Sequence, residues 1–556
     1  MEDDSKPKTR HPTWLDLSGV FRLAPADVTV LPALLACVCT AVPLVVLMAV
    51  ARLDVAAYAA AGAFTGLYGR NEPYRQRAQT LAAAATSLVA SVAIAGAVGV
   101  LTGHGVAHVL LVAAVAGLAK LLLDAARSGP PGGLMPTFAA ALTVTTVNRI
   151  DQSLIAVGLC AAAAAWSWVV CMSPRLVQAD GPQRIAAARA LEAVARRAET
   201  AETPSHERTR HAAALALERA WHALSLLSPS TAEVQFELIL MHAETVMRQT
   251  RLAVAAGSKP ATEAAMECRR LAGVLRHGSV PQIAPSSEEL AELAGVRAEA
   301  ELIEAASAPL LRSPRPARLT GWTALRFGSP DVTLAARTAL AAALAGLAAA
   351  GLGLGHSYWA SVSAVAVLAP MNLSGATRRA VQRAIGSAVG VLIGVAALAF
   401  APGPAVAVVF VIACTGLAEW TITRNYGLAL LFTTPVPLLL EALVQPLDPL
   451  VLARDRLLDT VVGAVVAVAA ALLLPNRGLA QALQVALDAA QAALVVASTE
   501  GPRDRLAVAR TVATRLSALR TAYDAAIGEP WSQDIPVERL LSIERDCHVA
   551  LAWLTE

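Results

Sequence analysis

The chain has 556 residues, of which 56% are hydrophobic and only 16% are charged, and its formal net charge is +3. Soluble domains carry about a quarter charged residues, so much of this chain is expected to avoid water. A net charge this small argues against nucleic acid as a partner. The basic residues are nearly all arginine and alanine is abundant, which favours a bacterial source.

The apolar segments fall into two blocks separated by polar sequence. A spanning helix needs about 20 apolar residues, and each block offers six segments, several of them shorter than that. The pattern predicts an all-α membrane protein with two six-helix transmembrane repeats, at 27–172 and 327–475. The expected spans are 28–51, 55–69, 79–101, 106–123, 134–147 and 152–172, then 332–353, 357–371, 384–400, 404–420, 426–444 and 457–475.

The two blocks open almost alike, which indicates an internal duplication. Phe21-Arg22-Leu23 leads through Asp27 into the first block, and Leu325-Arg326-Phe327 leads through Asp331 into the second. Both aspartates are expected to cap the first helix of their block. At nearly the same offset, Arg77 matches Arg383, Arg149 matches Arg456 and Asp151 matches Asp459.

The charge pattern predicts how the chain is oriented. With a cytoplasmic N-terminus, most arginines next to the spans fall inside and only Arg52, Arg149, Arg454 and Arg456 fall outside, as the positive-inside rule requires. Because each block has an even number of spans, the repeats are parallel. Segment 1–26, the polar region 173–326 and the tail 476–556 are then cytoplasmic. The last two show helical apolar stripes, for example Leu217, Trp221 and Leu224.

Two short segments stand at matching places in the blocks, 55–69 and 357–371. Short or interrupted helices in corresponding positions of two repeats point to a transport site. Hydroxyl groups there can replace a substrate's hydration, and guanidinium groups pair with carboxylates. The predicted substrate pathway is lined by Tyr358, Trp359, Ser361, Ser363, Arg379, Gln382 and Arg383 in the second block and by Tyr58, Thr65, Arg75 and Arg77 in the first.

A structural interpretation of these residues stays open. Tyr358 and Trp359 have the composition of a belt at the membrane interface, and each arginine alone is explained by topology. Topology does not explain Gln382 and the serines, so for the motif as a whole we favour a role in the substrate pathway.

Charged residues within or beside the spans are candidates for coupling to a proton or another ion, because a charge in the bilayer is costly. Glu419 and Asp459 are the two that we single out. A structural role is the alternative for both: Glu419 at the cytoplasmic interface, and Asp459, like Asp151, paired with a nearby arginine or capping a helix.

The sequence contains no nucleotide-binding, nucleophile or metal-ligand motif, so an enzyme, a cofactor and a metal are not expected. The seven cysteines are scattered and are expected to be free thiols. Any active transport would therefore depend on an ion gradient rather than on ATP.

Three motifs resemble the fusaric acid resistance-type family of integral membrane transporters. They are Tyr358-Trp359-Ala360 with Pro370, Gln382-Arg383 and Gly386; Arg424-Asn425-Tyr426-Gly427 with Thr433-Thr434-Pro435; and Arg456-Leu457-Leu458-Asp459 with Gly463. The first block departs from them, with Lys120 and a Pro-Pro-Gly-Gly loop near where Glu419 and Arg424-Asn425-Tyr426 would fall.

That superfamily includes bacterial aromatic carboxylic acid exporters and is similar to plant aluminium-activated malate transporters. The resemblance implies efflux of small organic anions such as aromatic carboxylates through the cell membrane, and a homodimer. Two other functions stay open: an anion channel, or a membrane-anchored scaffold whose cytoplasmic domains bind partners.

Overall fold

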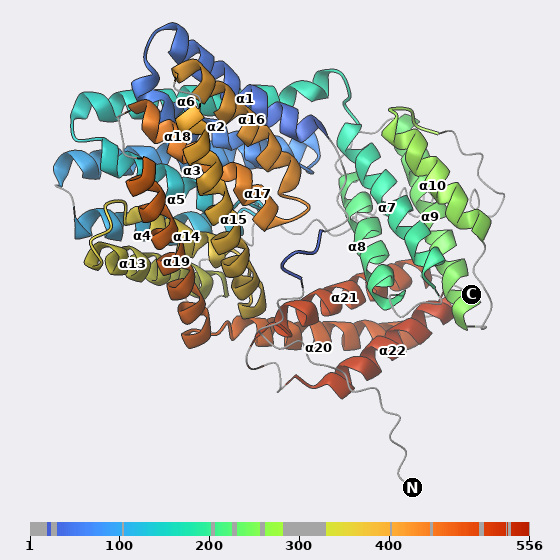
Figure 1. Ribbon diagram of the computed structural model, residues 1–556. Helices are drawn as coiled ribbons and strands as arrows, with labels where there is room; N and C mark the ends of the chain where they lie inside the picture. Colours follow the sequence, from blue (N-terminus) through green and yellow to red (C-terminus); the bar gives the residue numbers. More distant parts are fainter. Residues whose placement is uncertain are drawn as a thin grey trace, which may run out of the picture.

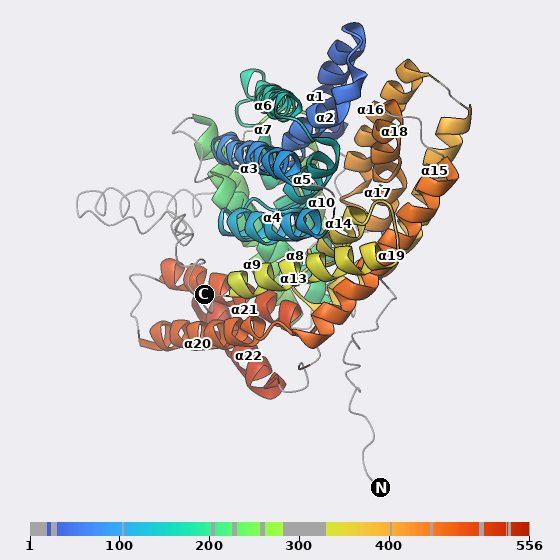
Figure 2. The ribbon, with the colours of Figure 1, turned by 90° about the vertical axis from the view of Figure 1, so that its left-hand side faces the viewer.

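The protein is described from a computed structural model, shown in Figures 1 and 2, which is mostly helical in the residues that it describes and has no strand among them. The all-α class predicted from the sequence is therefore confirmed for those residues. They are 19–23, 30–102, 105–201, 206–224, 231–255, 262–281, 330–400, 403–444, 449–499, 505–529, 531 and 535–554. Asp27 and the segment Leu325-Arg326-Phe327 lie outside the described residues. Asp331 lies in the first turn of a helix that begins at Pro330, rather than before it.

The first apolar block forms six helices, of which the second is short and ends in a 3₁₀ turn, η2 (Phe64–Leu67). Alanine, leucine and valine dominate them, and within lipid a helix satisfies every backbone polar group internally. The helices are α1 (Val30–Ala49), α2 (Ala56–Ala63), α3 (Tyr74–Leu101), α4 (Val106–Ala125), α5 (Leu134–Thr146) and α6 (Ile150–Met172).

The second block follows the same order of long and short helices, except that its fifth segment is divided at Thr434. The helices are α13 (Pro330–Gly351), α14 (Tyr358–Val367), α15 (Leu373–Phe400), α16 (Pro404–Thr421), α17 (Tyr426–Thr433), α18 (Pro435–Val444) and α19 (Pro449–Leu473). Pro435 explains the division, because proline has no N–H to donate to the preceding turn.

Nine helices in the described part of the chain are long and apolar enough to cross a membrane, where the sequence predicted twelve spans. The four short segments, 53–67, 134–146, 358–367 and 426–442, do not reach that length. α15 and α19 begin well before the predicted 384 and 457, because both helices continue through charged residues that ended the apolar runs. α20 (Gly478–Thr499), in the predicted cytoplasmic tail, is also apolar enough to span.

The two blocks pack together through a reciprocal pair of helix crossings. α13 packs on α4, and the two helices run side by side in Figure 2, while α1 packs on α16. Each crossing is closed by a glycine on the fourth helix of a block. A Cβ on Gly117 would meet the Cβ of Ala339 at 2.8 Å, and one on Gly416 would meet the Sγ of Cys37 at 2.4 Å. Only glycine permits backbones this close.

The helices outside the blocks form two further units. The central unit comprises α7 (Gly181–Glu199), α8 (His206–Leu224), α9 (Thr231–Ala255) and α10 (Thr262–Arg276), drawn in green in Figure 1. The tail unit comprises α20, α21 (Arg505–Ala526) and α22 (Val537–Leu554), drawn in red. Each has its own apolar core, with Leu191, Ile239 and Leu271 in the first and Leu487 and Val512 in the second.

The tail unit is joined to the second block just before α15. Asn372 Nδ2 donates to Ala525 O at 2.9 Å, and Ser374 N donates to Gly528 O at 3.0 Å. The adjacent Glu529 is 2% exposed, and burial raises its pKa to about 7 although Arg337 and two backbone hydrogen bonds act in the opposite direction. The joint thus places a buried carboxyl group where the tail unit meets the membrane helices.

Candidate functional site

A buried group of polar and aromatic side chains lies at the start of α14. Tyr358 and Trp359 are 8% and 2% exposed, so they are enclosed by protein rather than arranged as a lipid-facing belt. Tyr358 Oη donates to Glu441 Oε1 of α18 at 3.0 Å. Arg456 of α19 places its Cζ 3.3 Å from the centre of the Trp359 ring. Three helices therefore bring a cation, a carboxylate and two aromatic rings together.

A run of aromatic rings connects this group to the first block. Phe64 of η2 contacts Phe138 of α5 edge-on, with ring centroids 5.4 Å apart. Phe138 contacts Trp359 at 5.1 Å, and Trp359 contacts Tyr358 at 5.2 Å. Such contacts favour aromatic partners beyond the area that they bury. The run crosses from one block to the other, and the Arg456 guanidinium lies over its Trp359 ring.

Two arginines and one aspartate in this region are buried with unused hydrogen-bonding capacity. Asp459 is fully buried, and neither carboxylate oxygen has a hydrogen-bond partner among the described residues. The same holds for Nη1 of Arg456 and Nε of Arg383, which are both 6% exposed. Arg383 lies near enough to Arg456 for their charges to repel. Unsatisfied buried charges are costly, so this group is the candidate site for a ligand or an ion.

The predicted pairing of aspartate with arginine differs between the blocks. Arg149 and Asp151 form an ion pair of 3.0 Å in which both side chains are more than half exposed. Arg456 and Asp459, their matches in the second block, make no hydrogen bond with each other within the described structure. Arg456 was expected outside the spans, yet it lies two turns into α19 because that helix begins at Pro449.

The three predicted pathway residues of α15 lie around the start of α17. Arg383 Nη1 donates to Tyr426 Oη at 3.0 Å, and the Arg379 guanidinium lies 4.6 Å from the centre of the same ring. Gln382 Nε2 donates to Val20 O at 2.8 Å, and Asn425 Nδ2 donates to the same oxygen at 2.8 Å. The described N-terminal segment 19–23 is therefore held against the α15–α17 contact by two amides.

The two predicted serines are committed to helix packing. Ser361 Oγ donates to the backbone oxygen of Ala342 in α13 at 2.7 Å. Ser363 packs against Gly463 of α19, where a glycine Cβ would stand 2.6 Å from the serine Cβ. Both side chains are buried. The Ser361 hydroxyl is thus directed to the backbone of α13.

Among the described residues, the predicted residues of the first block make no hydrogen bond or ion pair with this group. Tyr58 Oη shares a hydrogen bond of 2.9 Å with Thr146 Oγ1. Thr65 is fully buried, and its hydroxyl has no described partner. Arg77 is 6% exposed and lies beside Cys171, whereas Arg75 is exposed. Glu419 is paired with Arg70 of the first block, through a contact of 2.8 Å from Arg70 Nε to Glu419 Oε1.

Sequence reasoning missed the parts of the site that lie far apart in the chain. Phe64, Phe138 and Tyr426 were not selected, and Arg456 was assigned to a loop. The usable signal was the spacing of Arg456 and Asp459, which puts both on nearby positions of one helix face. Nothing in the sequence indicates that Phe138 of the first block reaches Trp359 of the second.

The apolar helices and the enclosed charged and aromatic group define a multi-pass membrane protein with a buried polar site. Residues 340–470 match the family model described as fusaric acid resistance protein-like. This match supports the assignment of the chain to a fusaric acid resistance-like family, and it covers Tyr358, Trp359, Arg383, Arg456 and Asp459. No curated protein and no solved structure matches the chain.

Proposed function

We propose that the protein is a transporter that moves small organic anions, aromatic carboxylates in particular, out of the cell without hydrolysing ATP. One observation carries the proposal: the guanidinium of Arg456 lies over the buried Trp359 ring, which belongs to a run of aromatic side chains that reaches the other block. A guanidinium pairs with a carboxylate, and neighbouring rings favour an aromatic body. The family match at 340–470 supports transport as the activity.

The same proposal includes two parallel six-helix repeats, with both termini and both polar units in the cytoplasm. The reciprocal crossings support it, since Gly117 receives Ala335 and Ala339 of the other block, and Gly416 receives Ala33 and Cys37. The two residues that contact each glycine are four positions apart, and they lie on the first helix of their block. A pseudo-two-fold axis along the membrane normal would relate such contacts. The cell membrane and a homodimer belong to this proposal as well.

Asp459 is the proposed coupling residue of the two that the sequence singled out. It is fully buried and its carboxylate has no hydrogen-bond partner in the described structure, so it has capacity to take up a proton or another cation. Glu419 already has Arg70 as a partner, which favours a structural role for it.

Transport by purified protein in liposomes tests the function. Uptake of radiolabelled benzoate should be saturable and should fall by about thirtyfold or more in Arg456→Gln, because losing a buried charged contact costs about 2–5 kcal/mol. Arg149→Gln is the matched control, since it alters the exposed counterpart in the first block, and it should transport normally. Equal rates in the two variants would contradict the site.

Planar-bilayer recording separates the carrier from the anion channel. A carrier turns over too slowly to give resolvable single-protein currents. Discrete anion currents would therefore show that the protein is an anion channel and not an exporter. A protein that folds and carries neither flux nor current would favour the scaffold.

A further inference from the structure

A partly exposed histidine lies next to the buried acidic side chains of α19. His356 belongs to the loop between α13 and α14, and its side chain is 23% exposed. Its Nδ1 lies 3.6 Å from Oδ2 of Asp455, whose side chain is only 9% exposed. Gly355 leaves room for this approach, because a Cβ at that position would stand 3.3 Å from the same oxygen. The loop therefore places a titratable ring at the edge of the buried polar group.

A second aspartate lies one turn further along the same helix. Asp455 and Asp459 are four positions apart in α19, so they lie on one face with about 5–6 Å between their Cβ atoms. They are near enough for their charges to repel. Asp459 is fully buried, and neither of its carboxylate oxygens has a hydrogen-bond partner in the described part of the chain. From the loop inward, the exposed fraction thus falls from 23% to 9% and then to 0%.

The order of these side chains is that of a proton relay. Chains of histidine and carboxylate side chains carry protons in pumps and transporters, and imidazole exchanges a proton readily near neutral pH. His356 can take a proton from water and pass it from Nδ1 to Oδ2 of Asp455. A small rotation of the ring or one water spans the 3.6 Å between these atoms. The proton then moves along the face of α19 to Asp459.

The charged groups around the two aspartates leave one negative charge to be neutralised. Arg456 of α19 attracts both Asp459 and Glu441 of α18, and Arg383 of α15 lies beside Arg456. The Tyr358 hydroxyl of α14 donates to Glu441 and adds no charge. Three carboxylates therefore face two guanidinium groups. One proton shared by the aspartates balances this group, since neighbouring carboxylates disfavour each other's ionisation.

We propose that His356, Asp455 and Asp459 form a path along which a proton enters the buried site from the loop between α13 and α14. The inference rests on the proposed transport, since it names the coupling ion and its route. In the proposed orientation this loop faces the outside of the cell. A proton that enters there is exchanged for an anion that leaves the cytoplasm, and no other bond is formed or broken.

Two measurements on purified protein in liposomes separate the path from transport itself. The probe is radiolabelled phthalate, an aromatic dianion at neutral pH that does not cross lipid unaided. Counterflow, the exchange of labelled for unlabelled phthalate at equal pH on both sides, requires transport but no net movement of protons. Accumulation driven by a gradient of about one pH unit, acid inside and with the membrane potential clamped, requires the path. One proton per anion limits the accumulation to about tenfold.

Variants of the path should lose accumulation and keep counterflow. In His356→Gln and Asp455→Asn the accumulation ratio should fall from as much as about tenfold to about one, while counterflow continues because neither residue belongs to the proposed substrate site. Asp459→Asn should lose accumulation as well. Asp151→Asn is the matched control, since it alters the exposed counterpart of Asp459 in the first block, and it should keep both activities.

The outcomes distinguish the two proposals. If the parent protein shows no counterflow, the proposed transport is wrong and the path is wrong with it. Counterflow without accumulation in the parent protein, accumulation that persists in either His356→Gln or Asp455→Asn, or loss of counterflow in a folded variant overturns the path alone. Thermal unfolding of each variant accompanies the measurements. If Asp455→Asn is unfolded, His356→Gln decides the question, because its ring lies partly exposed in a loop.

Discussion

Arg70 and Glu419 form a buried ion pair across the two membrane blocks, with Arg70 Nε 2.8 Å from Glu419 Oε1 and Arg70 Nη2 also bonded to the Glu419 backbone oxygen. The side chains are 16% and 10% exposed. Arg70→Gln should lower the free energy of unfolding by about 3–5 kcal/mol, because it leaves a buried carboxylate without its cation. Thermal unfolding in detergent measures this.

The control for that pair is Arg52→Gln. Arg52 and Asp54 are 3.0 Å apart but about half exposed, so the loss should stay below about 1 kcal/mol. The double variant Arg70→Met with Glu419→Met should recover most of the lost stability, since an apolar pair replaces both charges. A double variant as unstable as Arg70→Gln would contradict this account.

Gly117→Val should separate α4 from α13. The new Cβ would meet Ala339 Cβ at 2.8 Å and the Ala335 backbone oxygen at 3.2 Å, and overpacking of this kind costs about 1–3 kcal/mol. Gly158→Val on α6 is the control, because a Cβ at Gly158 meets nothing within 4 Å. Equal melting temperatures for the two variants would show that the crossing is not tight.

Val20→Cys should react slowly with a maleimide, because Val20 is 2% exposed beneath the amides of Gln382 and Asn425. Adding Gln382→Ala should raise the rate about tenfold by releasing one of these hydrogen bonds. Phe21→Cys should react rapidly in both backgrounds, since Phe21 is 75% exposed.

The same cysteines report which side of the membrane the segment faces. Labelling of Phe21→Cys with an impermeant maleimide should occur in inside-out vesicles and not in intact cells. The reverse result would contradict the cytoplasmic N-terminus inferred from the arginine distribution.

Glu529 should make stability depend on pH. Its pKa is raised by burial from 4.5 to about 7, so between these values the folded state binds more protons than the unfolded state. The free energy of unfolding therefore falls as pH rises from about 4.5 to about 7 and is level above that. The melting temperature should fall by about 1–3 °C across this window, and Glu529→Gln should abolish that part of the fall.

Trp359→Leu should change substrate preference rather than abolish transport. The ring contacts Phe138 and lies under Arg456, and aromatic contacts of this type contribute about 0.5–1.5 kcal/mol. Benzoate transport should fall by about two- to tenfold, while acetate transport should change little. An equal loss for both acids would assign Trp359 to folding instead.

The sequence predicted the helical elements well because lipid imposes a local rule: each apolar run must form a helix. It also predicted the short segment that begins at 358, whereas the role of Trp359 in a substrate pathway stays a prediction. It misplaced Arg456, because a charge normally ends an apolar run, and α19 continues through it with the guanidinium covered by Trp359. Contacts such as Phe138 with Trp359 depend on how the blocks pack, and no local pattern encodes that.

Ser361 shows a second contact that no local pattern indicates. Ser361 was chosen because a hydroxyl can bind a substrate, but its proton is directed to the Ala342 backbone oxygen. In an apolar interior a hydroxyl has few hydrogen-bond partners, so that of Ser361 donates to a backbone oxygen of the neighbouring helix.

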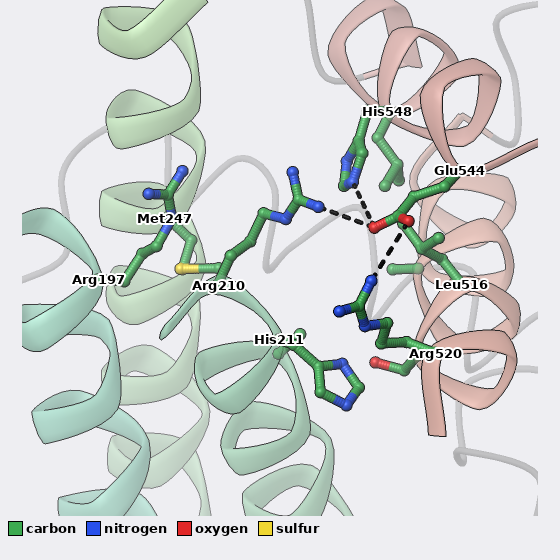
Figure 3. A pocket seen from close by; sticks show the side chains of 12 residues that line it. Arg197, Arg210, His211, Met247, Leu516, Arg520, Glu544 and His548 are labelled. Atoms are coloured by element: carbon green, nitrogen blue, oxygen red, sulfur yellow. Dashed lines mark hydrogen bonds and ion pairs between the residues drawn. The ribbon is translucent and has the colours of Figure 1, made fainter. Parts of the chain in front are cut away.

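α21 is one uninterrupted helix from Arg505 to Ala526. Near its C-terminal end, Arg520 lies 3.7 Å from Glu544 of α22 (Figure 3). Just beyond it, the backbone oxygens of Ala525 and Gly528 accept hydrogen bonds from Asn372 and Ser374 at the start of α15. The contact of Arg520 with Glu544 and the start of α15, the helix that bears Arg383, are thus connected through a single helix of the tail unit.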